Sequence, residues 1–455
     1  MERCAVATTG QLTVDHIAAV EGLQGPVTIE RRCADLPELI AVCRNGRADA
    51  ALIIGDTEQL TATVLAELRQ GGRRVVALCA AAEERDRLHR LGVTCFDDEV
   101  SAGDLALALQ GGQSTPAARS TTEHADGASP EGAAAPGGPA PPADTVEHAG
   151  QEDGSPAVEP DALLPAEPAT VTRPEGITVV WGGPGSPGRS TIALNLAAEI
   201  ALQGHEVLLV DADTVAASLV PQLGLMEETA GLAQACRAAD LGRLDAAALG
   251  AAVAVVEVSG SRFGLLSGLP RAARWPEIRE RSLIAVLEMA RARYDHVIVD
   301  IAASVEQDEE LSYDTIAPQR SGAALTCLRA ADRILAVGAA DPVSFSRLVK
   351  AIEDLQLSLP ETAAAQIEVV INKVRSEVIG RSPRDQLQRT WRQLGPDRGI
   401  DAFLTWDGAG CDAALLKGQV LAEAAPDSAL RRSIADLAGA ELPQRRTGLM
   451  SRFRR

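Results

Sequence analysis

The chain has few aromatic residues, no closely spaced pair of cysteines and no excess of positive charge. Each of these absences excludes some classes of protein. Aromatic residues make up 2% of the 455 residues, although hydrophobic residues make up 46%. A core of that composition is built from Ala, Val, Leu and Ile, which suits parallel sheets covered by helices. The net charge of -20 argues against a protein that coats nucleic acid or anionic lipid with its whole surface.

The 8 cysteines are scattered and form neither a C-x-x-C pair nor a cluster of metal-site spacing with histidines. We therefore expect reduced, mostly buried thiols. The N-terminus opens directly into a short apolar strand, so no signal peptide is visible. No stretch approaches the roughly 18 uninterrupted apolar residues that a membrane span needs. These features predict a cytoplasmic protein.

Composition also divides the chain into segments. Residues 112–173 consist mainly of Ala, Pro, Gly, Ser and acids, with too little apolar bulk to offset the entropy of ordering, which predicts a disordered linker. The predicted organisation is a small α/β domain over 1–111, the acidic linker over 112–173, a larger α/β domain with a mostly parallel sheet over 174–443, and a basic, apolar tail over 444–455.

In residues 1–111, apolar runs alternate with helical patterns, which predicts a small doubly wound domain. The expected strands are Cys4–Thr8, Val27–Arg31, Ala48–Ile54, Arg74–Cys79 and Val93–Phe96, and the expected helices are Leu36–Asn45, Leu60–Arg69, Glu83–Leu91 and Ala102–Gln110. This order resembles a response-regulator receiver domain.

The residues that a receiver uses for chemistry are missing from this domain. Ala7-Thr-Thr-Gly10 stands in place of the acidic pair, and Gly55 occupies the phosphoacceptor place, with Asp56 one residue late. Asp97-Asp-Glu99 follows the fifth strand, where a receiver supplies a lysine. The simpler interpretation is that these acids form a solvated loop. We expect a degenerate receiver-like domain used for docking or dimerisation, without phosphoryl transfer.

A strand, a glycine-rich loop and a helix follow one another from Ile177 to Leu202. Between the β-branched strand Ile177–Trp181 and the Ala/Leu helix lies Gly183-Pro-Gly-Ser-Pro-Gly-Arg-Ser-Thr191, which matches G-x4-G-K-[ST] with Arg189 in place of lysine. Glycines let backbone N–H groups converge on phosphate oxygens, and the helix N-terminus adds partial positive charge. The residues predicted to bind nucleotide here are Gly183, Gly185, Ser186, Pro187, Gly188, Arg189, Ser190 and Thr191.

Arginine keeps the positive charge of the missing lysine but is longer and fork-shaped, so we expect binding to survive better than catalysis. Ser190 is the expected Mg²⁺ ligand and Thr191 the next phosphate contact. The plain alternative is a glycine-rich turn with a structural role alone.

Two later strands end in carboxylates. Glu206–Val210 leads into Asp211-Ala-Asp213, and the apolar strand Asp295–Ile301 carries Asp300 near its carboxyl end. In an open parallel sheet these ends converge on the ligand crevice beside the loop. Carboxylates beside a triphosphate require a cation between them, so Asp300 is predicted to be the Walker-B acid that holds Mg²⁺ through water. The alternative for Asp211 and Asp213 is that they cap a strand and begin a loop.

The glycine-rich loop, Asn195 on the next helix, Val207–Asp213 and Val297–Asp300 occur in the order and spacing that resemble the MinD/ParA family of deviant P-loop ATPases, over roughly 176–442. The resemblance implies ATP and Mg²⁺ as cofactors and a nucleotide-dependent homodimer.

The same resemblance implies roles for particular residues. Asp211 would support the Mg²⁺ shell, and Asp213 would orient the attacking water. The predicted catalytic residues are Asp213 and Arg189, which stands in the place of the loop lysine. Asn372 stands where the family often places an asparagine against the adenine ring. The alternative for Asn372 is a strand-end hydrogen bond to its own loop.

The chain departs from the family at two places. The signature lysine that reaches a dimer partner's phosphates is replaced by Pro184, which has no N–H to donate. The stretch Asp300-Ile-Ala-Ala-Ser304 lacks the family's usual Pro-Pro-Gly. We therefore expect slow or atypical ATP hydrolysis.

The domain order resembles the CpaE/TadZ group, which positions pilus or secretion assembly machinery. It implies a nucleotide switch that recruits protein components of a membrane-associated assembly. One alternative is a partition ATPase that binds DNA without sequence preference, which the acidic composition disfavours. Another is a nucleotide-bound scaffold without hydrolysis. The arginines and large apolar residues of the tail 444–455 predict a weak peripheral contact with the inner face of the membrane, and a disordered solubilising end is the plainer alternative.

Overall fold

The structure is a computed structural model that describes most of the two predicted α/β domains. It describes residues 3–11, 14–55, 57–111, 176–185, 187–225, 230–306, 318–360 and 365–440. The predicted linker over 112–173 and the predicted tail over 444–455 lie outside the described residues, as do Asp56 and Ser186. None of the described helices combines the length and the apolarity that crossing a membrane requires.

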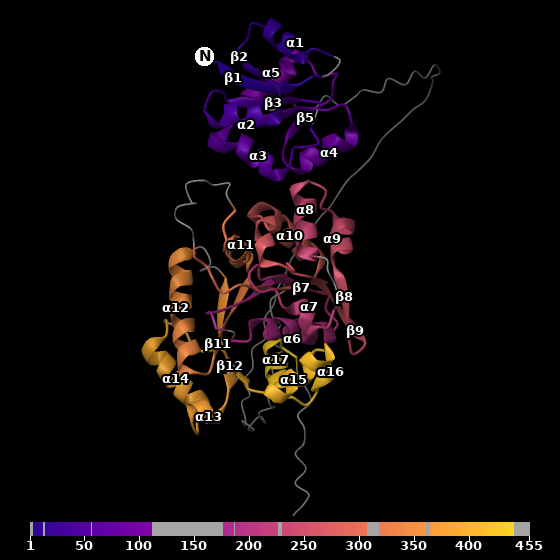
Figure 1. The fold of residues 1–455 in the computed structure, drawn as a ribbon. Coiled ribbons are helices and arrows are strands. Elements are labelled where there is room, and N and C mark those ends of the chain that lie inside the picture. The colour runs from indigo at the N-terminus through magenta and orange to yellow at the C-terminus, as the bar shows by residue number, and fades with distance from the viewer. Residues whose placement is uncertain are drawn as a thin grey trace, which may run out of the picture. The chain divides into compact units, whose positions relative to one another are not determined.

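The N-terminal domain contains a parallel sheet with the strand order β2-β1-β3-β4-β5 (Figure 1). Its strands are β1 Cys4–Gly10, β2 Val27–Cys33, β3 Ala50–Ile54, β4 Arg74–Leu78 and β5 Thr94–Phe96. Its helices are α1 His16–Gly22, α2 Leu36–Arg44, α3 Ala62–Leu68, α4 Ala82–Arg90 and α5 Ala102–Gln110, with the 3-10 turn η1 Gln70–Gly72. The predicted small doubly wound fold is therefore confirmed.

Each face of this sheet has its own apolar core. Leu39, Leu65 and Leu88 pack on one face from α2, α3 and α4, and α1 and α5 pack on the other. The sequence pattern does not predict α1, because this short helix buries only His16, Ile17 and Val20, too few residues for a helical period to be read.

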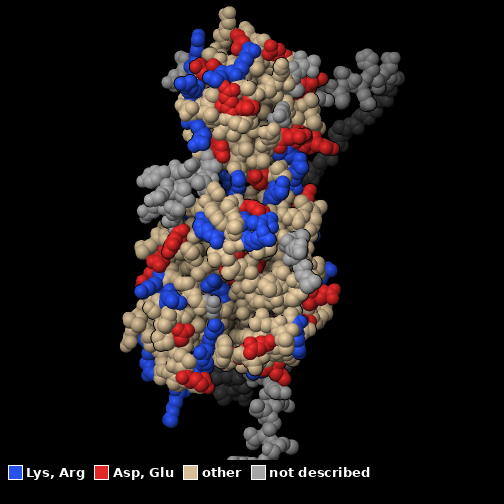
Figure 2. Space-filling model, in the orientation of Figure 1, with Lys and Arg blue, Asp and Glu red and all other residues tan. Residues whose placement is uncertain are grey.

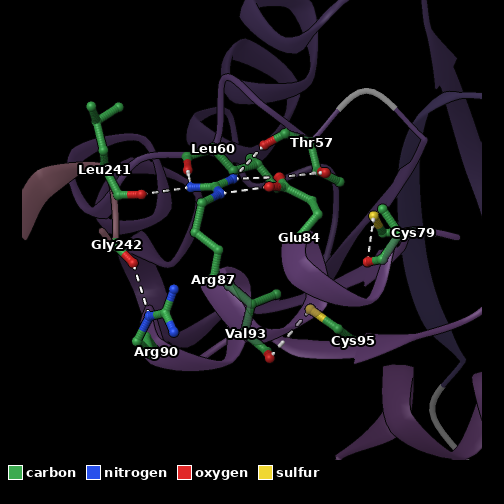
Figure 3. Close-up of polar contacts among 11 residues, drawn as sticks. Thr57, Leu60, Cys79, Glu84, Arg87, Arg90, Val93, Cys95, Leu241 and Gly242 are labelled. Atoms are coloured by element: carbon green, nitrogen blue, oxygen red, sulfur yellow. Dashed lines mark hydrogen bonds and ion pairs between the residues drawn. The ribbon is translucent and has the colours of Figure 1, made fainter. Parts of the chain in front are cut away.

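The loop after β3 is held by an arginine of α4 (Figure 3). The Arg87 guanidinium donates to the carbonyl oxygens of Thr57 and Leu60, each at 2.8 Å, and forms an ion pair of 2.6 Å with Glu84. Glu84 in turn accepts a hydrogen bond from the Thr57 hydroxyl at 2.8 Å. A receiver places its phosphoacceptor at this end of β3, and here the segment from Thr57 is fixed by structural contacts.

The C-terminal domain contains a mostly parallel sheet with the order β13-β12-β11-β6-β10-β7-β9-β8, in which β8 and β9 form an antiparallel edge. Its strands are β6 Gly176–Trp181, β7 Val207–Ala212, β8 Ala254–Val258, β9 Ser261–Leu266, β10 His296–Ile301, β11 Arg333–Ala339, β12 Gln366–Val374 and β13 Ala402–Thr405. The central strands are buried on both faces, which is why they are continuous apolar runs in the sequence.

Helices cover both faces of this sheet (Figure 1). The helices α6 Arg189–Leu202, α15 Gly408–Lys417, α16 Leu421–Ala424 and α17 Ala429–Leu437 contribute to one core together with the short α7 Leu219–Gln222. The helices α8 Gly231–Asp240, α9 Ala246–Ala252, α10 Glu280–Arg293, α11 Gly322–Ala330, α12 Pro342–Ser358 and α14 Pro383–Leu394 contribute to the other. The remaining turns are η2 Ala272–Glu277 and α13 Ser376–Ile379. This arrangement confirms the predicted α/β class.

Candidate functional site

The glycine-rich loop joins the end of β6 to the start of α6. Gly188 is the N-cap of α6 and has a positive φ of 102°. A Cβ at Gly188 would collide with the side-chain amide of Asn372, so a glycine is needed both for the backbone conformation and for the close approach of β12. Pro187 is buried, and its carbonyl oxygen accepts a hydrogen bond from Asn372 Nδ2 at 2.8 Å. The loop is thus held between β6 and the end of β12.

Arg189, which replaces the usual lysine, folds back over the loop. Its Nη1 donates to the carbonyl oxygen of Gly183 at 3.1 Å and lies 3.4 Å from that of Gly182. Its Nε is buried and has no partner among the described residues. An unpaired guanidinium N–H next to a loop of backbone donors suits a phosphate oxygen, which accepts charge-assisted hydrogen bonds. Ser190 and Thr191 begin the first turn of α6, half-buried beside it.

The strand neighbours bring two of the predicted carboxylates together. Asp300 of β10 and Asp211 of β7 are register partners, and each is only 1% exposed. Both carboxylate oxygens of Asp300 lack a hydrogen-bond partner among the described residues. An unpaired buried carboxylate is costly unless a cation or a proton compensates it. The donor set fits Mg²⁺, which in nucleotide sites takes one or two carboxylates, a serine hydroxyl, phosphates and waters.

These two carboxyl groups have shifted pKa values. Burial raises the pKa of Asp211 to about 6; the backbone N–H groups of Leu219 and Ser218 oppose the shift, and the charge of Asp213 adds to it. Burial raises the pKa of Asp300 well above its usual range, and Asp211 contributes further in the same direction. The Ser190 hydroxyl lies near Asp300 without meeting hydrogen-bond geometry, and it and the Arg189 charge oppose this rise of the Asp300 pKa. A cation placed here would stabilise both carboxylates as anions.

Asp211 and Asp213 also have structural contacts. Asp211 Oδ2 accepts the N–H groups of Ser218 at 3.0 Å and Leu219 at 3.1 Å. Asp213 Oδ1 accepts those of Val215 and Ala216, each at 2.8 Å. Both aspartates therefore hold the loop that follows β7, as the structural alternative predicts. Any role in nucleotide or metal binding would be additional.

Asn372 and Asn195 both make local hydrogen bonds. Asn372 Oδ1 accepts the Lys373 N–H at 2.8 Å, the strand-end bond expected as the alternative, while its Nδ2 is bonded to the loop at Pro187. Asn195 Nδ2 donates to the Thr191 carbonyl oxygen and its Oδ1 accepts the Leu421 N–H. Asn372 therefore lies beside the glycine-rich loop, and its assignment to the adenine ring stays a prediction.

Arg347 of α12 lies against the same loop, and no sequence motif marks this residue. Its Nη1 is 3.4 Å from the carbonyl oxygen of Pro184, and the backbone at Arg347 packs on Gly183. A Cβ at Gly185 would meet the Arg347 guanidinium at 2.6 Å, so this glycine leaves room for the cation. The spacing of motifs in the sequence does not connect the loop with an arginine on a distant helix. The one sequence signal is Asp341-Pro342, which marks the start of α12, because Asp341 is the N-cap of this helix.

A parallel sheet with a glycine-rich loop before a helix, and with buried acids at neighbouring strand ends, defines a P-loop nucleotide-binding protein. The model of the CobQ/CobB/MinD/ParA nucleotide binding domain matches residues 178–413, more than half of this chain. The chain belongs to this family.

Individual relatives are distant. The chain is 25% identical over 218 residues to the septum site-determining protein MinD of Synechocystis, covering 46% of this chain and 76% of that protein. A solved ParA family ATPase from Chlorobium tepidum is 22% identical with a TM-score of 0.47, covering 58% of this chain and 98% of the other. MinD from Pyrococcus horikoshii, solved with Mg-ADP, is 18% identical with a TM-score of 0.44, covering 58% and 94%.

The pKa of Asp211 predicts how nucleotide binding depends on pH. The ordinary aspartate pKa is about 4, and the folded value is about 6, so the nucleotide-free folded protein binds more protons than the unfolded chain between these values. Its stability therefore falls as pH rises through this window, and the loss is complete above it. Because Mg²⁺ needs the ionised carboxylates, ATP·Mg²⁺ should stabilise the protein more at about pH 8 than at about pH 5.

Thermal unfolding with and without ATP·Mg²⁺ across this range measures the effect. Asp211→Asn should flatten the dependence, and Asp354→Asn serves as the control, because Asp354 is exposed on α12. A stabilisation that is equal at both ends of the range in the unsubstituted protein would contradict the prediction.

Proposed function

We propose that this chain is an ATP-dependent localisation and assembly factor whose ATP-bound state forms a homodimer. The dimer recruits protein components of a membrane-associated machine, such as a pilus or secretion apparatus, from the cytoplasmic side. The observation that carries the nucleotide-binding part is Asp300, buried with both oxygens unpaired beside a glycine-rich loop. Membership of the MinD/ParA family and the domain order support the localisation part.

Each residue of the site has a task in this proposal. The backbone N–H groups of Gly183, Gly185 and Gly188 and those at the start of α6 bind the phosphates, and Arg189 Nε donates to one of the phosphate oxygens. Ser190, Asp211 and Asp300 hold Mg²⁺, which neutralises charge between the phosphates and the buried acids. Asp213 orients the attacking water. Asn372 positions the loop through Pro187 and borders the base.

Arg347 compensates in part for Pro184 at the signature-lysine position. The family lysine reaches from a dimer partner, whereas Arg347 belongs to the same chain and already lies at Pro184 and Gly185. A guanidinium offers bidentate hydrogen bonds to phosphate oxygens. Binding in a single subunit is then independent of the partner, which fits slow hydrolysis.

Replacing Arg347 with alanine is expected to weaken ATP binding about tenfold to a hundredfold, since a hydrogen bond to a charged group contributes roughly 1.5–3 kcal/mol. Lys350→Ala is the matched control, because Lys350 is exposed on the same helix. Calorimetric titration with ATP·Mg²⁺ measures both. Equal affinities for the two variants would remove Arg347 from the site.

The partition-ATPase alternative requires a basic face for DNA. On the face drawn in Figure 2, lysine and arginine side chains form small groups separated by acidic and neutral residues. The net charge of -20 also opposes binding to a polyanion. The scaffold alternative is nucleotide binding without turnover. Pro184 and Arg189 favour it, and the intact Ser190, Asp211, Asp213 and Asp300 oppose it.

One set of assays separates these functions: ATP binding and hydrolysis by the purified full chain, alone, with anionic liposomes and with DNA. The proposal expects measurable ATP binding, slow turnover and no stimulation by DNA. Stimulation by DNA alone would favour the partition function. Binding with no turnover under any condition would favour the scaffold, and absence of ATP binding would overturn all three.

The tail 444–455, which lies outside the described residues, is proposed as a weak membrane contact. Each arginine near an anionic leaflet contributes on the order of 1 kcal/mol, so a single copy binds weakly and two copies in a dimer gain through effective concentration. Sedimentation with anionic liposomes should therefore be greater with ATP than without it, and should be lost on truncation after Leu442. Equal pelleting of the full and truncated chains with ATP would show that the tail is not an anchor.

A further inference from the structure

The N-terminal domain has a cavity at the carboxyl edge of its sheet, separate from the nucleotide site. It has a volume of about 310 Å³ and is lined by the ends of β1, β2 and β3 and by the start of α1. In the order β2-β1-β3-β4-β5, the connections leave β1 and β3 in opposite directions, which opens a crevice outside their carboxyl ends. Ligands in open α/β sheets bind at this switch point.

Two buried polar groups that line this cavity are unpaired. Thr8 is 0% exposed and His16 is 4% exposed, and neither Thr8 Oγ1 nor His16 Nε2 has a hydrogen-bond partner among the described residues. Buried polar atoms are nearly always hydrogen-bonded, and an unpaired one lowers stability. They come from different elements, β1 and α1, and line the same cavity. An apolar residue of equal size would pack at either position without this loss of stability.

The groups around the cavity favour a ligand that accepts hydrogen bonds. The hydroxyls of Thr8 and Thr9, the His16 imidazole and the Arg32 guanidinium are all able to donate. Arg32 forms an ion pair of 3.0 Å with Glu21. Both side chains are about half exposed, so replacing this ion pair with a contact to a ligand requires little free energy. The carboxylate at the rim, Asp15, is already bonded through Oδ1 to the Ala18 N–H.

A metal ion fits this cavity poorly. Burial raises the pKa of the Cys33 thiol, which keeps it neutral at the cavity wall. Among the described residues, no group of three or more His, Cys, Asp and Glu side chains is arranged to hold a metal.

The volume of the cavity is at the lower end of the range of about 300–1,000 Å³ for ligand pockets, which excludes a dinucleotide and suits a small metabolite.

We propose that the N-terminal domain binds a small oxyanion, a carboxylate or phosphate metabolite, in the crevice between β1, β3 and α1. Thr8 and His16 donate to the ligand from within, and Arg32 neutralises its charge at the rim. The degenerate receiver-like domain is then a sensor of a diffusible anion, occupying the edge where a receiver is phosphorylated. This inference does not depend on the nucleotide site.

The test is titration of the full chain with inorganic phosphate and, separately, with succinate. Saturable binding by at least one of them is expected, with protection from hydrogen exchange in peptides that contain Thr8 and His16. Thr8→Val keeps the shape but removes the hydroxyl, so the affinity should fall about tenfold while the unfolding temperature of the free protein stays equal or rises. Thr94→Val, on the exposed side of β5, is the matched control and should change neither quantity.

The two probes also distinguish the source of the anion, because phosphate binding alone indicates a phosphorylated metabolite and succinate binding alone a carboxylic acid. Phosphate that binds at the nucleotide site instead is distinguished by Thr8→Val, because this substitution does not change the affinity of that site. If Thr8→Val does not fold, His16→Gln replaces it, with the same expected loss of affinity. The proposal is overturned if neither probe binds up to about 10 mM, or if Thr8→Val and Thr94→Val bind both probes equally.

Discussion

Replacing Arg189 and Ser190 together with alanine is expected to abolish ATP·Mg²⁺ binding. The double variant removes the guanidinium that lies over the loop and the hydroxyl predicted to hold Mg²⁺, beside an Asp300 whose carboxylate oxygens are unpaired. Charge-assisted hydrogen bonds contribute roughly 1.5–3 kcal/mol each, and with the Mg²⁺ contact the loss should reach about a thousandfold or more in affinity.

Calorimetric titration measures this loss, and the chain supplies a matched control. Arg381 and Ser382 form the same dipeptide, both exposed and remote in sequence from the loop, so Arg381→Ala/Ser382→Ala should bind ATP as the unsubstituted chain does. Unchanged ATP affinity in the Arg189→Ala/Ser190→Ala variant would contradict the assignment of the loop as a nucleotide site.

Removing the Asp213 carboxylate is expected to eliminate hydrolysis while leaving nucleotide binding largely intact. A carboxylate that orients the attacking water acts mainly in the transition state, and its loss typically lowers turnover by about 10²–10⁴-fold. Asp213 Oδ1 also accepts the Val215 and Ala216 N–H groups, so Asp213→Ala alone would mix catalysis with loop structure.

Asp213→Asn separates the two roles, because the amide keeps an acceptor oxygen for the loop and loses the charge. A catalytic Asp213 predicts that both variants lose turnover and that Asp213→Asn keeps ATP affinity and thermal stability. If Asp213→Asn hydrolyses ATP at the full rate, above background, the residue is structural. If the unsubstituted chain has no turnover, the scaffold function replaces the proposed one.

Most of the fold was predictable because its signals are local. The apolar runs, the helical periods between them and the Gly/Pro-rich loop are readable without neighbours, and the predicted α/β class is confirmed. The short α1 was missed because too few of its residues are buried to show a period. The domain boundaries and the site assignments stay predictions.

The site was only partly predictable. The loop and the carboxylates at strand ends follow from motif and spacing, but a motif does not say what else a side chain binds. Asn372 fixes the loop through Pro187, and Asp213 fixes the segment that follows it. The sequence does not show these backbone partners, because they depend on how the loops fold.

The sequence by itself determined the class of protein, a P-loop α/β domain preceded by a small doubly wound one, because strand, loop and helix follow one another within a few residues. Only the tertiary structure decided which groups meet. Asp300 lies beside Asp211 because β10 and β7 are neighbours, Arg347 reaches the loop because α12 packs on Gly183, and Thr8 shares a cavity with His16. Strand order and helix packing depend on long-range burial of apolar surface, which local patterns do not encode.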